Sequence, residues 1–408
     1  MSLMKCELKK TMRSPLVWIV LVVVLIIDVV QIFMGSFPSL LSTDIQSLKE
    51  RYAYFSGAIT QEWIDHYQQE AEAILNNPQY QVSEQEAEEI VQRFIDEYGY
   101  TEEAVRNNLV LFLNEDGLDE YEKYEDVQVA SNFYVNAFEY GDMMAQYYTD
   151  TYPGKKGEVL ATYTQEHYNY LASKYTANYD YCFGYSNIRN ILTVYPYTTG
   201  LAILVALAPL FSSEYAKRTD ALLLTTKNGK RKLVHAKVMA GTLITVLIWG
   251  AITILNIVLI FGLYGTTGWN AFWQDWIIRL SPFPWNQGII TMVALITSLL
   301  GTLFFAFILM LISSISKNQF ISIVIGAAIL LFPVFDFDFT NNYIVNMIYH
   351  FLPTRIMMGE TIWQSFNPFY VAGIVVPHQY VIMASAIMIS ICTIPFTGHF
   401  FIKHQVEN

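Results

Sequence analysis

Charge is scarce in this sequence. Only 15% of its 408 residues are Asp, Glu, Lys or Arg, whereas 53% are hydrophobic and the mean hydropathy is +0.31. Soluble domains usually carry about a quarter charged residues. The deficit argues against an ordinary soluble protein and indicates a chain that lies largely in a lipid bilayer.

Cysteine and the common catalytic motifs are also lacking. The three cysteines, Cys6, Cys182 and Cys392, lie in a terminal tail, the polar segment and the last apolar run, so the sequence predicts no disulfide framework. No Gly-rich phosphate loop ending in Lys-Ser/Thr and no His-Glu-x-x-His motif occurs. We therefore expect no catalytic, cofactor-binding or metal-binding residues and no enzymatic activity in this chain. The absence of any Asn-x-Ser/Thr acceptor favours a bacterial source.

Long apolar runs are what the sequence has instead. A bilayer core about 30 Å thick requires about twenty apolar residues of helix. Six runs predict six transmembrane helices, although the fifth is short and contains a proline. The runs cover residues 16–33, 198–211, 238–263, 289–315, 320–335 and 381–401.

Basic residues mark one face of the membrane. Thirteen of the 24 Lys and Arg residues fall in the N-terminal tail, the segment 212–237, a turn at Lys317 and the C-terminal tail. Segments rich in Lys and Arg remain cytoplasmic. The pattern predicts a multi-pass plasma-membrane protein with both termini in the cytoplasm.

The opposite face receives an acidic segment rich in tyrosine. Residues 34–193 hold 27 of the 36 acidic residues and nine basic ones, a net charge of −18, and 20 of the 28 tyrosines. Such a surface repels nucleic acid and attracts cations, although acidity is also usual for a well-solvated exterior. The tyrosines suit either a recognition surface or packing between helices.

This segment is predicted to be helical. Ser83 and Glu86 form a capping box, and Gly99 is placed to end the helix that follows. A second helix is expected after Thr101, and a third over residues 58–75. The second should place Val105, Leu109 and Leu113 on one face.

The predicted spans are almost free of ionisable side chains. Asp28 is the single acid within a run, with Gln31 one turn away. A carboxylate is costly in a membrane, so Asp28 should face other helices or water. It is either an intramembrane polar site or a residue hydrated near the outer face.

The segment 212–237 contains a short apolar run between charged residues. Ala221 to Leu224 follow a possible cap at Thr219, and Asn228-Gly229 predicts a turn. The apolar side of such a helix must be covered by lipid headgroups or by a partner protein.

Here the sequence resembles the type-2 permease subunits of ATP-binding-cassette exporters. The resemblance covers the topology of the membrane part and a short motif of charged residues, a leucine pair, a threonine and a basic turn. The matching residues are Glu214, Thr219, Asp220, Leu222, Leu223, Thr225, Lys230, Arg231 and Lys237. The large segment between the first two spans departs from simpler members, so the resemblance does not indicate the substrate.

The resemblance implies a separate cytoplasmic ATPase, which binds ATP and Mg and hydrolyses the ATP. It also implies a second permease copy or paralogue. It also implies that residues 212–237 dock on that ATPase through Glu214, Thr219, Asp220, Leu222, Leu223, Leu224, Lys230 and Arg231. The resulting fold class is an all-α membrane protein with six transmembrane helices and a large helical extracellular domain between helices 1 and 2.

The predicted division has an interfacial helix over 1–13, a first transmembrane helix over 14–35, an extracellular domain over 36–193, and helices 2–6 over 194–408. The last part includes the coupling loop 212–237 and an outer hairpin over 335–379 that lies in the interface or re-enters the membrane. The predicted function is export of a peptide or another amphipathic compound. A membrane-anchored binding or sensor protein and an ion-coupled carrier centred on Asp28 are the alternatives.

Overall fold

The structure is a computed structural model, which describes residues 3–35, 43–216, 231–273, 281, 283–316, 318–332, 349–364, 368–371 and 373–403. Over these residues the chain is mostly helical, with two antiparallel two-stranded sheets. It therefore departs slightly from the expected all-α class. The chain divides into two compact units, which we call the membrane unit (Met1–Ile45, Cys182–Trp273 and Trp285–Asn408) and the acidic unit (Gln46–Tyr181 with Gln274–Pro284).

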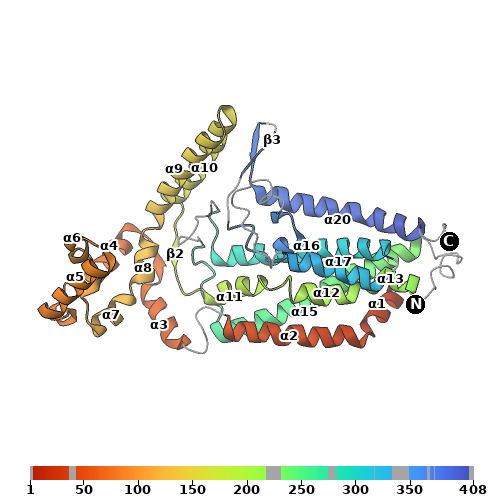
Figure 1. Cartoon of the computed structure of the whole chain (residues 1–408), viewed down its shortest axis with the longest axis horizontal. Coiled ribbons are helices and arrows are strands. Elements are labelled where there is room, and N and C mark those ends of the chain that lie inside the picture. The colour runs from red at the N-terminus through yellow and green to blue at the C-terminus, as the bar shows by residue number, and fades with distance from the viewer. Residues whose placement is uncertain are drawn as a thin grey trace. The chain divides into compact units, whose positions relative to one another are not determined.

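The membrane unit is a bundle of long helices that run side by side (Figure 1). In the described part of the chain, four of its helices are long and apolar enough to cross a membrane, and two apolar helices, Thr199–Tyr215 and Gln319–Leu331, are shorter. Six spans thus remain a prediction. The elements are α1 (Leu3–Met12), α2 (Pro15–Met34), α11 (Phe183–Leu192), α12 (Thr199–Leu207), α13 (Pro209–Ala216), α15 (Arg231–Tyr264), α16 (Gln287–Ile315), α17 (Gln319–Leu331), α19 (Pro353–Met357), β3 (Phe369–Val371), β4 (Ile374–Val376) and α20 (His378–Lys403).

Helix α2 contacts the bundle along one narrow stripe. Its buried residues, Val17, Val24, Asp28 and Ile32, are spaced seven, four and four residues apart and so share one face. Most of its other side chains are apolar and exposed. A helix that is apolar all round but buried on one side is typical of a span that faces lipid on its other sides.

The expected second span is interrupted at a proline. Pro209 cannot donate a backbone hydrogen bond, so one helical bond is missing where α12 gives way to α13. Ser313 on α16 bonds to the backbone on both sides of Pro209: its hydroxyl donates to the Ala208 carbonyl at 2.7 Å and accepts from the amides of Phe211 and Ser212 at 3.1 and 3.2 Å. A side chain of a neighbouring helix therefore stabilises the break.

The helix that contains the expected third span includes residues ahead of it. Residues 231–237, which the sequence placed in the loop 212–237, are helical and continue without a break through α15. None of these residues disfavours a helix. The charge of Lys237, which marked the boundary in the sequence, is buried among protein partners.

Part of the predicted hairpin 335–379 is buried beside the middle of a span. Residues 335–348 lie outside the described residues. A Cβ on Gly301, halfway along α16, would lie 2.4 Å from the backbone nitrogen of Met357, and Ile356 and Met357 are fully buried. Only a glycine permits α19 to approach α16 this closely. The segment thus packs against the middle of α16, and its place in the interface or within the membrane stays a prediction.

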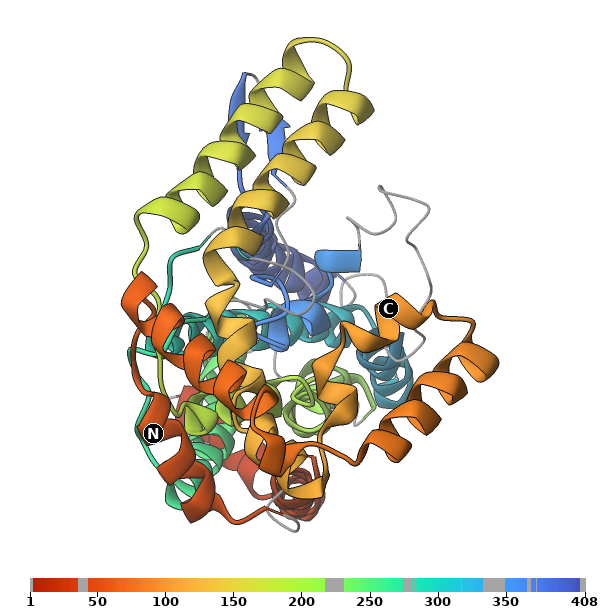
Figure 2. The same cartoon turned by 90° about the vertical axis from the view of Figure 1, so that its left-hand side faces the viewer.

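The acidic unit is built from short helices and one long antiparallel helical hairpin, α9 with α10 (Figure 2). Its two strands, β1 and β2, pair Gly57 with Tyr179 and Ala58 with Asn178. The elements are α3 (Ile45–Phe55), β1 (Gly57–Ala58), α4 (Gln61–Leu75), η1 (Pro78–Tyr80), α5 (Glu84–Tyr98), α6 (Glu102–Arg106), η2 (Leu109–Phe112), α7 (Glu115–Glu122), α8 (Glu125–Ser131), α9 (Phe133–Thr151), α10 (Lys155–Ser173) and β2 (Asn178–Tyr179).

The capping signals located the helices of this unit well. The capping box of Ser83 and Glu86 is formed, and Gly99 ends α5 in the left-handed conformation with φ of 70°. The helix after Thr101 was predicted too long, because α6 stops at Arg106 and a 3-10 turn follows. The helix expected from residue 58 begins at Gln61, after Thr60 caps it.

Many of the tyrosines in this unit form an aromatic core. Tyr179 is buried and lies stacked on Tyr52, with ring centroids 5.3 Å apart, while Phe55 and Trp63 pack edge-on or tilted against it. The packing alternative therefore accounts for these rings. Tyr54, Tyr98, Tyr100, Tyr147 and Tyr170 stay exposed.

Candidate functional site

The first helix places an acidic side chain inside the membrane unit. Glu7 and Thr11 are the buried residues of α1, one turn apart on the same face. The basic residues Lys5, Lys9 and Arg13 are exposed. Helix α1 is therefore amphipathic, as the predicted interfacial helix requires, but its inward face carries a carboxylate.

Lys237 on α15 is completely buried, and its ammonium group donates hydrogen bonds to three acceptors. Its ammonium Nζ lies 2.8 Å from Glu7 Oε2, 2.9 Å from the Leu210 carbonyl and 3.0 Å from Glu214 Oε1. An ammonium has three N–H donors, so all of them are used. Lys10 on α1 also donates to Glu214 Oε1. We call these four side chains, Glu7, Lys10, Glu214 and Lys237, the charge cluster.

The charge cluster joins three separate helices. Glu7 and Lys10 come from α1, Glu214 from α13 and Lys237 from α15. Its two ammonium and two carboxylate groups balance. A buried charge is tolerated when it is paired and hydrogen-bonded, but removal of one partner costs about 3–5 kcal/mol. The cluster therefore fixes the relative position of these helix ends rather than adding net stability.

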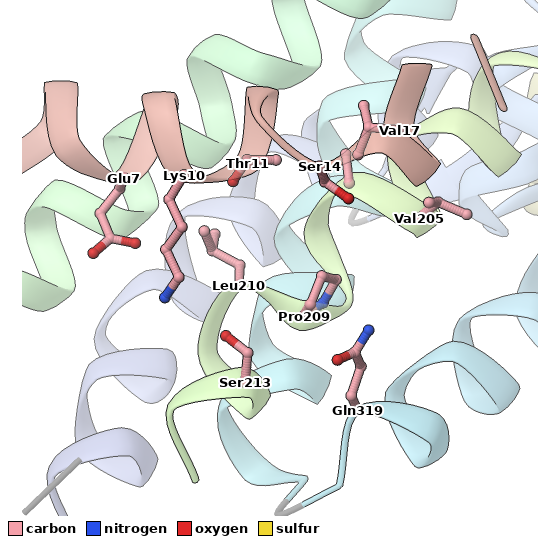
Figure 3. Close-up of a pocket in the computed structure, with 11 residues that line it drawn as sticks. Glu7, Lys10, Thr11, Ser14, Val17, Val205, Pro209, Leu210, Ser213 and Gln319 are labelled. Carbon is pink, nitrogen blue, oxygen red and sulfur yellow. The ribbon is translucent and has the colours of Figure 1, made fainter. Parts of the chain in front are cut away.

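A cavity of about 220 Å³ lies beside the charge cluster (Figure 3). Lys10 and Glu7 reach into it from α1, opposite Ser213 on α13 and Gln319 on α17. Polar side chains line one part, and the remaining lining residues are Thr11, Ser14, Val17, Val205, Ala206, Pro209 and Leu210. A polar cavity of this size has room for several waters. Water can thus reach the rim of the cluster while Lys237 stays sealed.

The charge cluster lies at both ends of the predicted coupling segment. Glu214 precedes residues 217–230, and Arg231, which is exposed, follows them. Thr219, Asp220, Leu222, Leu223, Leu224 and Lys230 lie outside the described residues. Glu214 is only 4% exposed, so its carboxylate faces the protein interior and not a docking surface.

The sequence contains a signal for the charge cluster, although the cluster was not predicted from the sequence. Glu7 is the single acid of a basic tail and lies one turn from Thr11 on the less polar side of α1. Lys237 stands among Ala236, Val238 and other apolar residues at the start of a span. Opposite charges in such settings predict a buried pair, although nothing in the sequence tells which partners meet.

Asp28 lies in a second buried polar group. Asn256 on α15 donates from Nδ2 to Asp28 Oδ2 at 2.9 Å and to the Tyr195 hydroxyl at 3.3 Å, and that hydroxyl donates to Thr253 at 3.1 Å. Asp28 is fully buried. Its side chain therefore faces other helices and is not exposed to solvent. Gln31 is half-buried, with its side chain over Gly35.

A third buried polar group joins α11 to the residues that follow α19. Arg189 Nε lies 3.0 Å from Glu360 Oε1, and its NH1 donates to Thr291 on α16 at 2.9 Å. Trp273 donates to the same Glu360 oxygen at 2.7 Å. These contacts lie at the last turn of α11 and the start of α16, whereas Ser313 and the charge cluster lie near the end of α16. Buried ion pairs thus fix helices near both ends of the bundle.

Comparison with known families gives one match. A family model described as ABC-2 family transporter protein matches residues 1–340, which include the acidic unit, the charge cluster and Asp28. No curated protein and no solved structure gives a significant match. The match covers more than half of the chain.

Proposed function

The chain belongs to the ABC-2 family of transporter proteins, and we propose that it exports its substrate by coupling to a separate cytoplasmic ATPase through residues 212–237. Members of this family are membrane permease subunits that work with an ABC ATPase. The resemblance seen in Glu214, Thr219, Asp220, Leu222, Leu223, Lys230 and Arg231 supports the coupling segment. ATP and Mg would be bound by the partner and not by this chain.

The observation that carries this proposal is the position of the charge cluster. It ties the helix before residues 217–230 to the helix after them, through Glu214 and Lys237, and ties both to α1 through Glu7. A force applied to that segment would therefore act on α13, α15 and α1 together. Coupling requires such an element, because a loop with loose ends would absorb the movement.

The proline break supplies the place where movement would enter the span. Closure of two ATPase subunits on ATP would push the coupling segments and, with them, α13. Because one helical hydrogen bond is already missing at Pro209, α13 can change its angle to α12 with little loss of backbone bonding. We propose that this change opens the path between two permease copies, or between this chain and a paralogue.

The acidic unit would lie outside the cell and meet the substrate. Its net charge favours cationic ligands, and exposed rings such as Tyr98 and Tyr100 offer contact area. A cationic amphipathic peptide fits both features. The proposed location follows from the basic residues around residues 212–237.

The experiment is co-purification, from the source cells, of an ABC ATPase with full-length variants of this chain. Burying a leucine side chain contributes roughly 1.5–3 kcal/mol, so changing Leu222 and Leu223 together to Asp should abolish ATPase binding. The matched control is Lys227→Gln with Lys230→Gln, which removes charge from the same segment and should lower binding much less, because exposed pairs contribute about 0–1 kcal/mol.

Two outcomes would contradict the proposal. If the leucine variant binds the ATPase as well as the unaltered chain does, residues 222–223 are not the docking ridge. If no ATPase binds even the unaltered chain, a membrane-anchored receptor becomes the better reading. The ion-coupled carrier has less support, since Asp28 is the single carboxylate within the stripe of α2 and its contact is a neutral amide.

A further inference from the structure

A second cavity lies between the start of α15 and the end of α20. Its volume is about 700 Å³. Its apolar lining consists of Val234, Val238, Ile394, Pro395, Gly398 and Ile402, and its polar lining consists of Arg231, His235, His399 and Lys403. We call it the basic groove. It shares no lining residue with the charge cluster or with the cavity beside that cluster.

The charges of the basic groove are of one sign. All its polar lining residues are basic or can become so, and among the residues that the structure describes no carboxylate lines it. Arg231, His235, His399 and Lys403 are exposed, and within the described parts of the chain no acid is paired with them. The charge cluster differs, because each of its ammonium groups already has a carboxylate. The positive charge of this groove therefore favours an anionic ligand.

The apolar part of the basic groove extends along two helices, α15 and α20, that are long and apolar enough to cross a membrane. Arg231 and Val238 are seven residues apart on α15, and Lys403 and Ile394 are nine apart on α20. At 1.5 Å per residue, the groove extends about 10–13 Å from its charged end toward the middle of the spans. The outer side of α20 nearby carries exposed Ile391 and Phe396, as a lipid-facing surface does.

Two residues of α20 shape the groove. Pro395 lies inside the helix and carries no side chain long enough to cover the space beside it. A Cβ on Gly398 would lie 3.3 Å from Val234 Cγ1, so α20 approaches α15 closely there and forms the floor. The result is an open slot with a charged mouth and an apolar wall.

From this charge and depth we infer that the basic groove binds an anionic phospholipid, with its phosphate at Arg231 and Lys403 and an acyl chain along Val238 and Ile394. A free phosphate would use the charged mouth but not the apolar wall. A lipid uses both. The inference does not depend on the direction of transport or on the ATPase.

The test measures which lipid stays bound to the purified full-length protein. Protein in detergent with equal phosphatidylglycerol and phosphatidylcholine is analysed by native mass spectrometry. We expect the unaltered chain to retain phosphatidylglycerol in preference. Each basic residue near a membrane contributes about fivefold in binding, so Arg231→Gln with Lys403→Gln should lower that preference on the order of twentyfold. Both side chains are exposed, so the fold should be unaffected.

The matched control is Lys9→Gln with Arg13→Gln, which removes two exposed basic residues from the first helix and its following turn. It should leave the preference unchanged. Equal loss in both variants, or no loss in either, would overturn the site. Displacement of phosphatidylglycerol by inorganic phosphate would show a phosphate site instead of a lipid site. A disulfide between two copies of an Ile402→Cys variant in membranes would show that a second chain covers the groove.

Discussion

Replacing Lys237 by methionine is the sharpest test of the charge cluster. The change keeps most of the side-chain volume but removes the ammonium, which makes contacts of 2.8, 2.9 and 3.0 Å to two carboxylates and a carbonyl. Glu214 would keep Lys10. Glu7, whose side chain is 12% exposed, would lose its partner.

The expected cost follows from that uncompensated carboxylate. Breaking a buried ion pair by removing one partner destabilises a protein by about 3–5 kcal/mol. A second change, Glu7→Gln, removes the stranded charge, so the double variant should recover a large part of the loss. The two substitutions should therefore be non-additive, as contacting residues are. This recovery distinguishes a paired charge from a residue that merely fills space.

The assay is thermal unfolding of the purified protein in lipid nanodiscs, read beside ATPase co-purification. Lys232→Met is the matched control, because Lys232 lies on the same helix and is exposed. Its effect should stay within about 0.5 kcal/mol. If Lys237→Met unfolds at the same temperature as Lys232→Met, the buried pair does not fix the helix ends. An additive double variant would refute the pairing of Lys237 with Glu7.

Three further predictions concern the intramembrane acid, the orientation and the acidic unit. Asp28→Asn preserves an acceptor for Asn256 and should be tolerated, whereas Asp28→Leu leaves buried polar groups unpaired and should cost about 1–3 kcal/mol in unfolding free energy; equal effects would remove the polar contact from consideration. With the other native thiols replaced, an impermeant thiol reagent on intact cells should label a Glu97→Cys variant and spare Cys6; the reverse labelling would invert the proposed topology. Burial lowers the pKa of His167 on α10 below the ordinary histidine value of about 6.5. Below about pH 6.5 the unfolded chain therefore binds more protons than the folded chain, so the stability of the acidic unit should fall as the pH drops through that value. If hydrogen exchange of α10 depends on pH equally in the His167→Gln variant, this expectation is wrong.

Sequence patterns located elements wherever a local rule decides them. Helix ends in the acidic unit followed from Ser83, Glu86 and Gly99, because caps act within four residues of chain. Apolar run length located α2, α15, α16 and α20, since span length is set by bilayer thickness. The family was recognisable from a motif, since charged and leucine positions around residues 214–231 are spaced along one continuous segment.

Patterns failed where the deciding contact joins distant residues. Lys237 looked like a loop residue because its partners lie 23 and 230 positions away. The short α6 and the following 3-10 turn depend on how Val105 and Phe112 pack against Val91 in one small core. Asp28 could be recognised as unusual, but its partner Asn256 reads as an ordinary polar residue in an apolar helix. Long-range pairing is set by tertiary packing, which one sequence does not display.

The bonds around Pro209 bear on how much energy a movement of α13 would need. In an uninterrupted helix, bending costs backbone hydrogen bonds that only the helix itself can restore. Here the amides of Phe211 and Ser212 already rest on the hydroxyl of Ser313. A hydroxyl turns about a single bond and can follow those amides as they shift. The start of α13 is thus bonded to a side chain of a neighbouring helix, so α16 would influence the angle at which α13 leaves α12.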